Sequence, residues 1–439
     1  MRHLTPLRQS LKPGETELSQ NVWNLYLEIA FFGFLFGITQ TFLNVYTIRL
    51  GASNTTLGLL NAMQPLVFAI GAIPAARLVE RTARRQQFIV VTGTLHRCGV
   101  VALGLIPFAL TANRAEAVVV VVALMSIPQV MATIAFSAMF ADVVPNELRA
   151  RVVAVRNTLL GLTSTIASFL GGQFLGLSAA TVSAPFNALF TFPLNYQLLF
   201  LLAFAVSLLG IIYLGRIHAH DPIPKPESTA VLDTRLVLER VASFARLMRN
   251  QREFSRYALA MFVLHWGLYL PLPLYSLYWV RTLHASDSFI GLLLTVQSIT
   301  TMVVYPILPR LNARIGTRGL VALSALLISL YPLATAVTTT LEPLLLVSVL
   351  GGAGGAMFGL STFNLLLEVT PQERRPSFIA TFNSAAFTAG FIAPFIGTAL
   401  LDVLTIEQDL LLGSALRFVG FLAFVAMVGV SGKRKAVKV

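Results

Sequence analysis

Twelve apolar segments of roughly 20 residues each constrain this chain more than any other feature. A helix of that length spans the hydrocarbon core of a bilayer, and lipid offers no partner to exposed backbone groups, so each segment should be helical. Only 12% of the 439 residues are charged, against about 25% in soluble domains. The sequence therefore predicts an all-α integral membrane protein with twelve transmembrane helices, near 22–46, 55–78, 87–110, 116–140, 152–176, 191–215, 256–280, 288–309, 319–340, 343–367, 377–401 and 410–430.

The chain also repeats itself. Leu50–Gln64 returns as Leu283–Gln297 with seven identical positions, and Asp142–Arg149 returns as Glu368–Arg375. The two matches keep the same order, which indicates a duplicated chain. In a strongly apolar protein, a parallel repeat is typical of transporters built from two equivalent halves. We therefore expect two pseudo-symmetric six-helix bundles.

The longest polar interval separates the two expected bundles. It opens with alternate prolines at 221–226, which exclude a helix, and continues with an apolar stripe from Val237 to Met248 with arginines largely off it. This basic amphipathic helix either lies on the inner membrane surface or packs on the bundle as a connector. The expected parts are a cytoplasmic tail at 1–20, an N-terminal bundle at 21–215, the linker at 216–253, a C-terminal bundle at 254–431 and a basic cytoplasmic tail at 432–439.

The net charge of +13 is unevenly distributed. With the N-terminus placed inside, 27 of the 32 Lys and Arg residues fall in inside segments, and only Arg49, Arg114 and Arg281 fall in outside loops. This bias predicts a multi-pass protein of the plasma membrane, or of the inner membrane if the source is a bacterium, with both termini in the cytoplasm. It also accounts for the basic balance without a nucleic-acid partner.

Residues for covalent or metal chemistry are sparse. Cys98 is the only cysteine, which excludes disulfides and thiolate metal sites. The apolar segments hold no paired carboxylates, no histidines at metal-ligand spacing and no nucleotide-binding loop. We therefore expect no enzyme, no catalytic residues, no metal and no cofactor. The polar first 20 residues and the long first apolar segment indicate a starting transmembrane helix, not a cleaved signal peptide.

The loop after the second apolar segment carries a family motif. Ala76–Arg85 resembles the Gly-x-x-x-Asp-Arg-x-Gly-x-Arg signature of the major facilitator superfamily, with alanine at both glycine positions and Glu80 for the aspartate. The equivalent loop of the second half, Ala313–Arg318, keeps Arg, Gly and Arg but lacks the acid. The twelve helices and the repeat extend the resemblance over nearly the whole chain. The resemblance implies two bundles around a central cavity, lined by helices one, four, seven and ten, with alternating access.

Polar stripes at helical spacing occur on the four helices that this resemblance places around the cavity. On helix one, Gly33 and Gly37 share a face with the amide side chains of Gln40 and Asn44. Helix packing by small and polar residues is the alternative, and we prefer it for Gly351, Gly355 and Gly359. Gln64 and Gln297, which the repeat matches to each other, are also expected to line the cavity. The expected substrate-cavity residues are Gln40, Asn44, Gln64, Gln129, Thr133, His265, Trp266, Tyr269, Gln297, Ser361 and Asn364.

Ionisable residues inside apolar segments are costly and are functional candidates. Glu28 and His265 are the candidates for proton coupling, because both side chains can exchange a proton. The alternatives are structural: a salt bridge for Glu28, bonds to carbonyls or to Glu28 for Arg97, and a neutral hydrogen-bonded ring for His265. His96 and Arg417 belong to the same group, and the sequence leaves the roles of Glu28, Arg97 and Arg417 open.

Charged residues of both signs cluster in the repeated loops. Opposite charges there would hold the cytoplasmic side closed, and Asp142 with Arg81 is one pair to test. The alternative is that the arginines only follow the positive-inside bias. The expected cytoplasmic gate residues are Glu80, Arg81, Arg84, Arg85, Asp142, Arg149, Arg314, Arg318, Glu368 and Arg375.

These features favour a secondary active transporter that moves a small organic solute by alternating access. The few charges in the expected cavity favour a neutral or amphipathic compound, and efflux is preferred on family frequency. Proton-coupled drug exporters of this superfamily carry an arginine in helix four and the motif Gly-Pro-x-x-Gly-Gly in helix five. Here helix four has no arginine and residues 167–172 lack the proline, which weakens the assignment as an exporter. An uncoupled facilitator and a non-transporting sensor with a transporter fold remain as alternatives. The expected partners are the solute, the bilayer and protons, and the expected state is a monomer.

Overall fold

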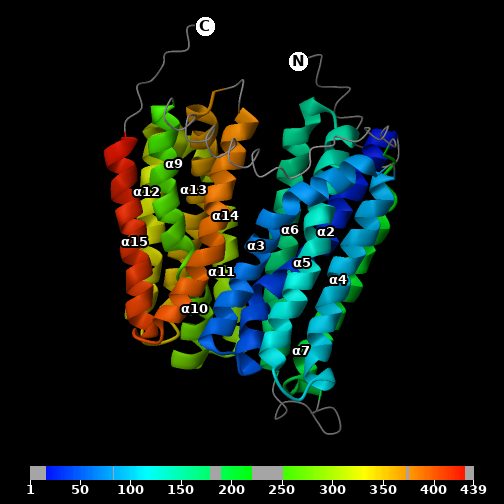
Figure 1. The fold of residues 1–439 in the computed structure, drawn as a ribbon, viewed down its shortest axis with the longest axis horizontal. Helices are drawn as coiled ribbons and strands as arrows, with labels where there is room; N and C mark the ends of the chain where they lie inside the picture. The colour runs from blue at the N-terminus through cyan, green and yellow to red at the C-terminus, as the bar shows by residue number, and fades with distance from the viewer. Residues whose placement is uncertain (1–15, 83, 178–188, 220–250, 372–374, 431–439) are drawn as a thin grey trace, which may run out of the picture. The chain divides into compact units, whose positions relative to one another are not determined.

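The computed structural model describes residues 16–82, 84–177, 189–219, 251–371 and 375–430, and within these ranges every long element is a helix (Figure 1). The expected amphipathic helix of the linker lies outside the described residues, as do most of the two tails. The first six expected segments are all helices. They are α2 (Glu17–Arg49), α3 (Asn54–Arg81), α4 (Arg85–Ala109), α5 (Arg114–Val143), α6 (Asn146–Gly176) and α7 (Leu194–Leu214).

The second half is helical as well, with more interruptions. The seventh expected segment is divided among α9 (Arg252–Tyr269), α10 (Leu272–Leu277) and the π-helical η2 (Tyr278–Thr282). The remaining elements are α11 (Asp287–Val304), the short 3-10 element η3 (Tyr305–Ile307), α12 (Leu308–Val337), α13 (Leu344–Val369), α14 (Arg375–Leu400) and α15 (Ile406–Met427).

Eleven stretches in the described ranges are long and apolar enough to cross a membrane, and one of them contains two crossings. The stretch 287–337 has 51 residues. A helix of that length would reach roughly 77 Å, far more than the ~30 Å of the hydrocarbon core. Gly316 interrupts it with a φ of +75°, a conformation that favours glycine. The prediction of twelve transmembrane helices is therefore confirmed.

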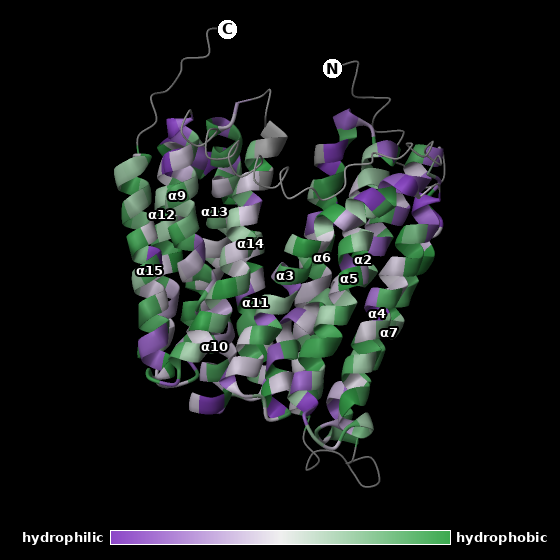
Figure 2. Cartoon of the chain, viewed as in Figure 1, coloured by the Kyte–Doolittle hydropathy of each residue, from purple (hydrophilic) through white to green (hydrophobic). Residues whose placement is uncertain are grey.

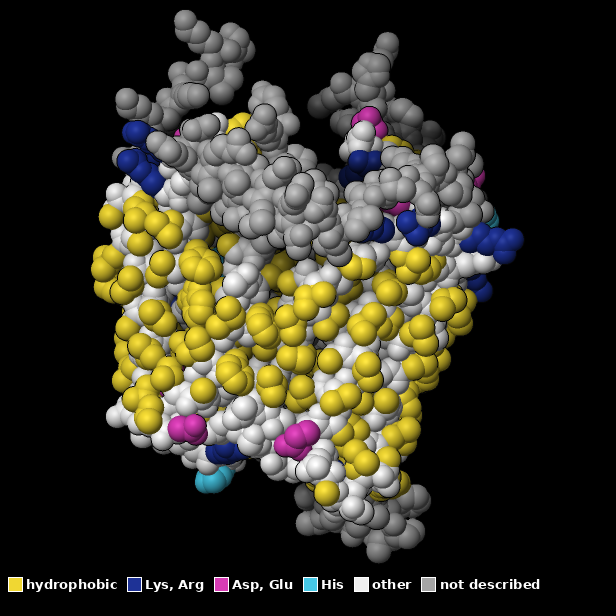
Figure 3. Space-filling view, in the orientation of Figure 1, with side chains coloured by type: hydrophobic (Ala, Val, Ile, Leu, Met, Phe, Trp, Pro, Cys, Tyr) yellow, Lys and Arg dark blue, Asp and Glu magenta, His cyan; other side chains and the backbone are white. Residues whose placement is uncertain are grey.

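The chain forms two compact units. The first contains residues 1–226 and 285–295, and the second contains 227–284 and 296–439. In the first unit α2 packs against α6 and α7, and α4 and α3 pack against α5. In the second unit α15 packs against α9 and α12, and α12 packs against α13. Large hydrophobic side chains remain exposed along the sides of the helices, as expected for surfaces that face lipid (Figure 3). Figure 2 shows the same helices coloured by the hydropathy of each residue.

The first residues of α11 belong to the first unit because they make close contacts there. Asp287 is buried and accepts from Arg49 at the end of α2, with Nη2 and Oδ1 2.6 Å apart. One turn further, a Cβ on Gly172 would lie 3.0 Å from the Cα of Gly291. Small residues thus let the backbones of α6 and α11 approach closely.

Glycines on α2 allow the same kind of approach to α6. A Cβ on Gly37 would lie 2.3 Å from the carbonyl oxygen of Ser164, and one on Gly33 would lie 2.0 Å from Oγ1 of Thr163. The helix-one face that carries Gly33 and Gly37 therefore packs against α6. On this face the glycines serve helix packing and do not line a cavity.

The packing expected of the glycines on α13 is correct only at one position. A Cβ on Gly351 would lie 2.7 Å from the ring of Tyr331, so this glycine does permit close packing. Gly355 and Gly359 are exposed, with no described atom within 4 Å of a Cβ, so the packing interpretation was wrong for them. A run of glycines every fourth residue does not reveal which one meets a neighbour.

A buried arginine, Arg417, donates hydrogen bonds to backbone carbonyls at the break between α9 and α10. The Arg417 side chain of α15 donates from Nε to the Gly267 carbonyl at 2.8 Å and from Nη1 to the Ile328 carbonyl at 2.7 Å. It also donates from Nη2 to Leu268 O at 3.3 Å and to Tyr275 Oη at 3.0 Å. The break leaves carbonyls without helical partners, and the guanidinium supplies donors for them.

The α2–α6 contact gives a stability prediction. Gly37→Ala should lower the melting temperature of the purified protein in detergent, because its methyl group would meet the α6 backbone. The matched control is Gly161→Ala on α6, where a Cβ has no described atom within 4 Å. Equal melting temperatures for the two variants would contradict the close contact.

The break in the seventh span gives a second prediction. Arg417→Leu should destabilise the protein by about 2 kcal/mol or more, because it removes several charge-assisted hydrogen bonds from buried acceptors. The adjacent Phe418 is 43% exposed, so Phe418→Leu serves as the control and should unfold like the wild type. Thermal unfolding in detergent measures both, and a wild-type curve for Arg417→Leu would overturn this role.

Candidate functional site

A cavity of about 270 Å³ lies within the first unit. Five helices contribute to it, namely α2, α4, α5, α6 and α7, and all its lining residues belong to this unit. Its size is close to the lower end of pockets for small organic ligands, about 300 Å³. Its charged and aromatic lining residues are Glu28, His96, Arg97, Arg156, Phe32, Phe36 and Phe136.

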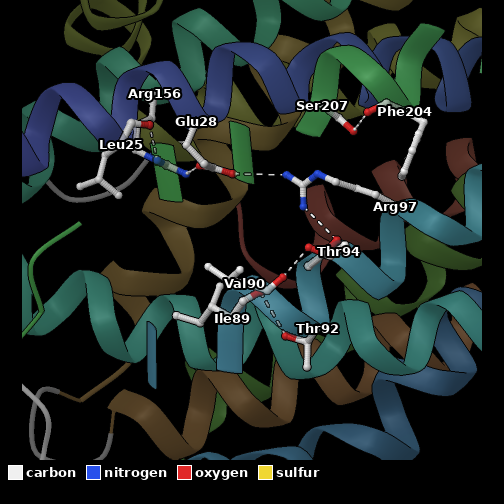
Figure 4. A network of polar contacts seen from close by, with 11 residues as sticks. Leu25, Glu28, Ile89, Val90, Thr92, Thr94, Arg97, Arg156, Phe204 and Ser207 are labelled. Carbon is white, nitrogen blue, oxygen red and sulfur yellow. Dashed lines mark hydrogen bonds and ion pairs between the residues drawn. The ribbon is translucent and has the colours of Figure 1, made fainter. Parts of the chain in front are cut away.

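One carboxylate joins two guanidinium groups in this cavity (Figure 4). Arg156 of α6 donates from Nη2 to Glu28 Oε2 at 3.0 Å, and from Nη1 to the Leu25 carbonyl. Arg97 of α4 places Nη2 3.8 Å from the other oxygen, Oε1. All three side chains are at least nine-tenths buried. The structural alternatives stated for Glu28 and Arg97, a salt bridge and a bond to carbonyls or to Glu28, describe these contacts.

Small residues make room for this network. Arg97 donates from Nη1 to the carbonyl of Gly93, one helical turn earlier, at 3.0 Å. A Cβ on Gly93 would lie 3.1 Å from that same nitrogen, so a larger residue would press on the guanidinium. On α7, a Cβ on Gly210 would lie 3.0 Å from the backbone oxygen of Glu28. Glycines on two helices therefore let the neighbouring helices and side chains close in on Glu28.

Arg97 uses few of its donors. Its contact with Glu28 is too long for a hydrogen bond, and its Nε has no hydrogen-bond partner among the described residues although it is buried. Its guanidinium lies over the ring of Phe32, 5.2 Å from the centroid, and that of Arg156 lies 4.6 Å from the centroid of Phe136. These cation–π contacts hold the charges but leave N–H groups of Arg97 available.

Two of the expected cavity residues line this pocket. Gln129 and Thr133 of α5 belong to its wall. Gln64 of α3 donates to Gln129, with Nε2 and Oε1 3.2 Å apart, so the structure brings the three side chains together. Their location beside the charged network keeps them as candidates for binding.

The two cavity residues expected on helix one, Gln40 and Asn44, are not among the residues that line this pocket. Asn44 and Asn61 exchange two amide hydrogen bonds, at 3.3 and 3.1 Å, which join α2 to α3. Gln40 is exposed. The Asn44 amide is therefore occupied by helix–helix packing, which was the alternative interpretation for polar residues of this kind.

The expected residues of the second unit form a separate group. His265 Nδ1 lies 2.7 Å from the Met261 carbonyl, and its ring lies within about 6 Å of the rings of Tyr269, Phe358 and Phe382. The ring is therefore bonded to the backbone in an aromatic setting. The remaining members lie on three helices of this unit: Trp266 packs on Phe262, Gln297 contacts Gly352, Ser361 is buried beside Ser324, and Asn364 is half-buried.

The expected gate residues form several separate contacts. Asp142 pairs with Arg85, with Oδ2 and Nη1 2.9 Å apart. Arg149 donates to the Val144 and Ala141 carbonyls. In the second unit Arg318 pairs with Glu253, and Glu368 accepts from Thr317. Glu80, Arg81, Arg84 and Arg314 are exposed, and the side chain of Arg375 lies outside the described part.

Two buried charged residues were missed from the sequence. Arg156 was counted with the cytoplasmic segment, yet it lies ten residues inside α6 and is 8% exposed. Asp409 falls just before the expected twelfth segment, yet it is fully buried in α15 with both oxygens unpaired among the described residues. Arg156 already falls within the expected segment 152–176, and extending the twelfth segment by one residue would have included Asp409. No group of three potential metal ligands occurs in the described ranges.

Parts of the chain resemble two drug-resistance proteins in sequence. Over 143 residues it is 25% identical to Multidrug resistance protein 1 of Bacillus subtilis (strain 168), covering 33% of this chain and 36% of that protein. Over 169 residues it is 24% identical to the quinolone resistance protein NorA of Staphylococcus aureus (strain MRSA252), covering 38% and 43%. The matched regions thus span less than half the length of these two relatives.

Solved structures share the fold over nearly the whole chain. A mutant of the nucleoside transporter NupG matches with a TM-score of 0.71 at 14% identity, over 92% of this chain and 99% of that one. A D-xylose–proton symporter matches with a TM-score of 0.69 at 17% identity, over 96% and 99%. The sequence model of the Major Facilitator Superfamily matches residues 25–264 and 257–438. The chain belongs to the major facilitator superfamily of membrane transporters.

Proposed function

We propose that this transporter exports a small amphipathic organic solute by secondary active transport. The observation that carries the proposal is the cavity of the first unit, where a buried charged network meets aromatic side chains. Polar and ionisable groups at membrane depth are expensive and typically mark a transport pathway. The export direction draws support from the partial likeness to two resistance proteins. An uncoupled facilitator is the second candidate.

The proposed setting is the plasma membrane, with both termini in the cytoplasm and the protein as a monomer. The concentration of Lys and Arg in alternate loops supports this orientation. The proposed bundles, 21–215 and 254–431, would move against each other in alternating access. In that orientation the Arg85–Asp142 pair lies at the cytoplasmic end of α4 and α5.

The Arg85–Asp142 pair should bias the resting conformation. Both groups are partly exposed, so the pair contributes about 1 kcal/mol or less, enough to shift a population ratio several-fold. Asp142→Asn should speed labelling of a cysteine at Ser137 by a membrane-impermeant thiol reagent from the cytoplasmic side, in a Cys98→Ser background. The exchange Arg85→Asp with Asp142→Arg should partly restore the wild-type rate.

The control for this test is Arg84→Gln, an exposed neighbour that does not pair with Asp142 in the structure. Its labelling rate should equal that of the background protein. Unchanged labelling in Asp142→Asn would reduce these charges to topological anchors, and failure of the exchange to restore the rate would reject the pairing.

Proton coupling is part of the proposal. Glu28 and His265 remain candidate carriers, and the unpaired carboxyl group of Asp409 joins them because it is buried without a hydrogen-bond partner among the described residues. A carboxyl group at membrane depth can take up and release a proton, and such groups typically mark proton pathways. His265 is the weakest of the three candidates, because its Nδ1 already bonds to the Met261 carbonyl.

The coupling prediction uses purified protein in liposomes with an imposed pH gradient. Glu28→Gln, His265→Asn and Asp409→Asn are compared for gradient-driven uptake and for exchange of a fluorescent amphipathic dye. Neutralising the carrier should abolish gradient-driven accumulation while exchange continues, since exchange needs no net proton movement. Asp402→Asn, on an exposed loop residue, is the control. If all three variants still accumulate dye with the gradient, coupling through these groups is refuted and facilitation is favoured.

A further inference from the structure

The cavity of the first unit carries an excess of positive charge. Its lining contains two guanidinium groups, Arg97 and Arg156, and one carboxylate, Glu28, while His96 places Nδ1 3.2 Å from the Met125 carbonyl. Arginine remains charged under all ordinary conditions. One positive charge in this buried cavity is therefore unmatched by any lining residue.

The geometry leaves this surplus charge available to a ligand. Arg156 is held by the Leu25 carbonyl and by a short contact to Glu28. Arg97 is 4% exposed, makes one hydrogen bond to the Gly93 carbonyl, and has a buried Nε without a partner among the described residues. An unpaired donor on a buried cation is costly, and the cost is removed when an anion accepts from it.

The surroundings specify the rest of the ligand. Phe32, Phe36 and Phe136 line the same cavity, together with the aliphatic side chains of Ile89 and Leu214. The amide of Gln129 and the hydroxyls of Thr133 and Ser137 are the neutral polar groups on the α5 wall. A planar apolar body fits the aromatic wall, and a carboxylate matches the fork of a guanidinium group.

We propose that this cavity binds an organic carboxylate with an aromatic or aliphatic body, and that its acidic group bonds to Arg97 beside Arg156. The inference rests on the proposed function, since it names the substrate class of the same site, and it selects an amphipathic anion over a neutral solute. Glu28 competes with the ligand for the two guanidinium groups, because one of its oxygens accepts from Arg156 and the other lies 3.8 Å from Nη2 of Arg97.

The test is isothermal titration of the purified protein in detergent, with empty micelles as the blank. The probes are 2-naphthoate, its neutral amide 2-naphthamide and the cation 2-naphthylmethylammonium. Naphthoate should bind about tenfold or more tightly than the amide, and the cation should bind more weakly still. Equal affinity for naphthoate and its amide would overturn the proposal.

Variants identify the groups responsible. Arg97→Gln and Arg156→Gln should weaken naphthoate binding about tenfold or more and weaken amide binding much less, because the amide carries no charge to pair with a guanidinium. Glu28→Gln should strengthen naphthoate binding, because it removes the competing carboxylate. A salt bridge with only a structural role predicts a lower melting temperature for Glu28→Gln and no gain in affinity, which would reject the proposal. The matched control is Arg151→Gln, which changes an exposed arginine on α6, the helix that carries Arg156. This variant should bind naphthoate like the wild type.

Folding and function are checked separately. Gel filtration and thermal unfolding confirm that each variant is folded, and Arg97→Lys, which keeps the charge but loses the fork, replaces a Gln variant that does not fold. Proteoliposomes that transport the amide but not naphthoate would refute the proposed substrate class and leave the transport function intact. A different outcome is that naphthoate binds in a way that depends on both arginines, while none of the probes is transported. That result would support the binding site and refute the transport function.

Discussion

The structure depends on one constraint: hydrocarbon cannot form hydrogen bonds. Every backbone group at membrane depth must therefore find its partner inside the protein, which explains why the long described elements are helices. The same constraint governs the interruptions. Where the seventh span breaks between α9 and α10, the guanidinium of Arg417 donates to carbonyls that the helix no longer satisfies. A charge that is costly in lipid thus stabilises a break that would otherwise be costly too.

Close packing supplies what the hydrophobic effect does not, because a helix gains little by exchanging lipid for another apolar helix. The contacts that join α2 to α6 and α6 to α11 depend on glycines that bring backbones within van der Waals distance. Half-buried polar pairs such as Asn44 with Asn61 add directional bonds, here between α2 and α3. Polar residues in this membrane protein are thus divided between packing and the lining of a cavity, and sequence spacing alone does not separate the two uses.

The charged network of the first unit combines both uses. Glu28 and Arg156 connect α2 to α6, while Arg97 on α4 approaches the carboxylate without completing a hydrogen bond. A fully satisfied network would serve only to hold the helices together. The incomplete bonding of Arg97 gives the proposed anion site its physical basis.

The sequence by itself determined the fold class, the number of crossings and the family resemblance, because these follow from segment length, apolar composition and the repeat. It also singled out Glu28 and Arg97 as costly residues in lipid. Only the tertiary structure decided which residues meet. Arg156 meets Glu28 from about 130 positions away, and Asp142 pairs with Arg85. A Cβ on Gly351 would meet a tyrosine ring, whereas one on Gly355 would have no described atom within 4 Å. Helical periodicity fixes the face on which a side chain lies, but the rotation and depth of each neighbouring helix are set by packing over the whole bundle.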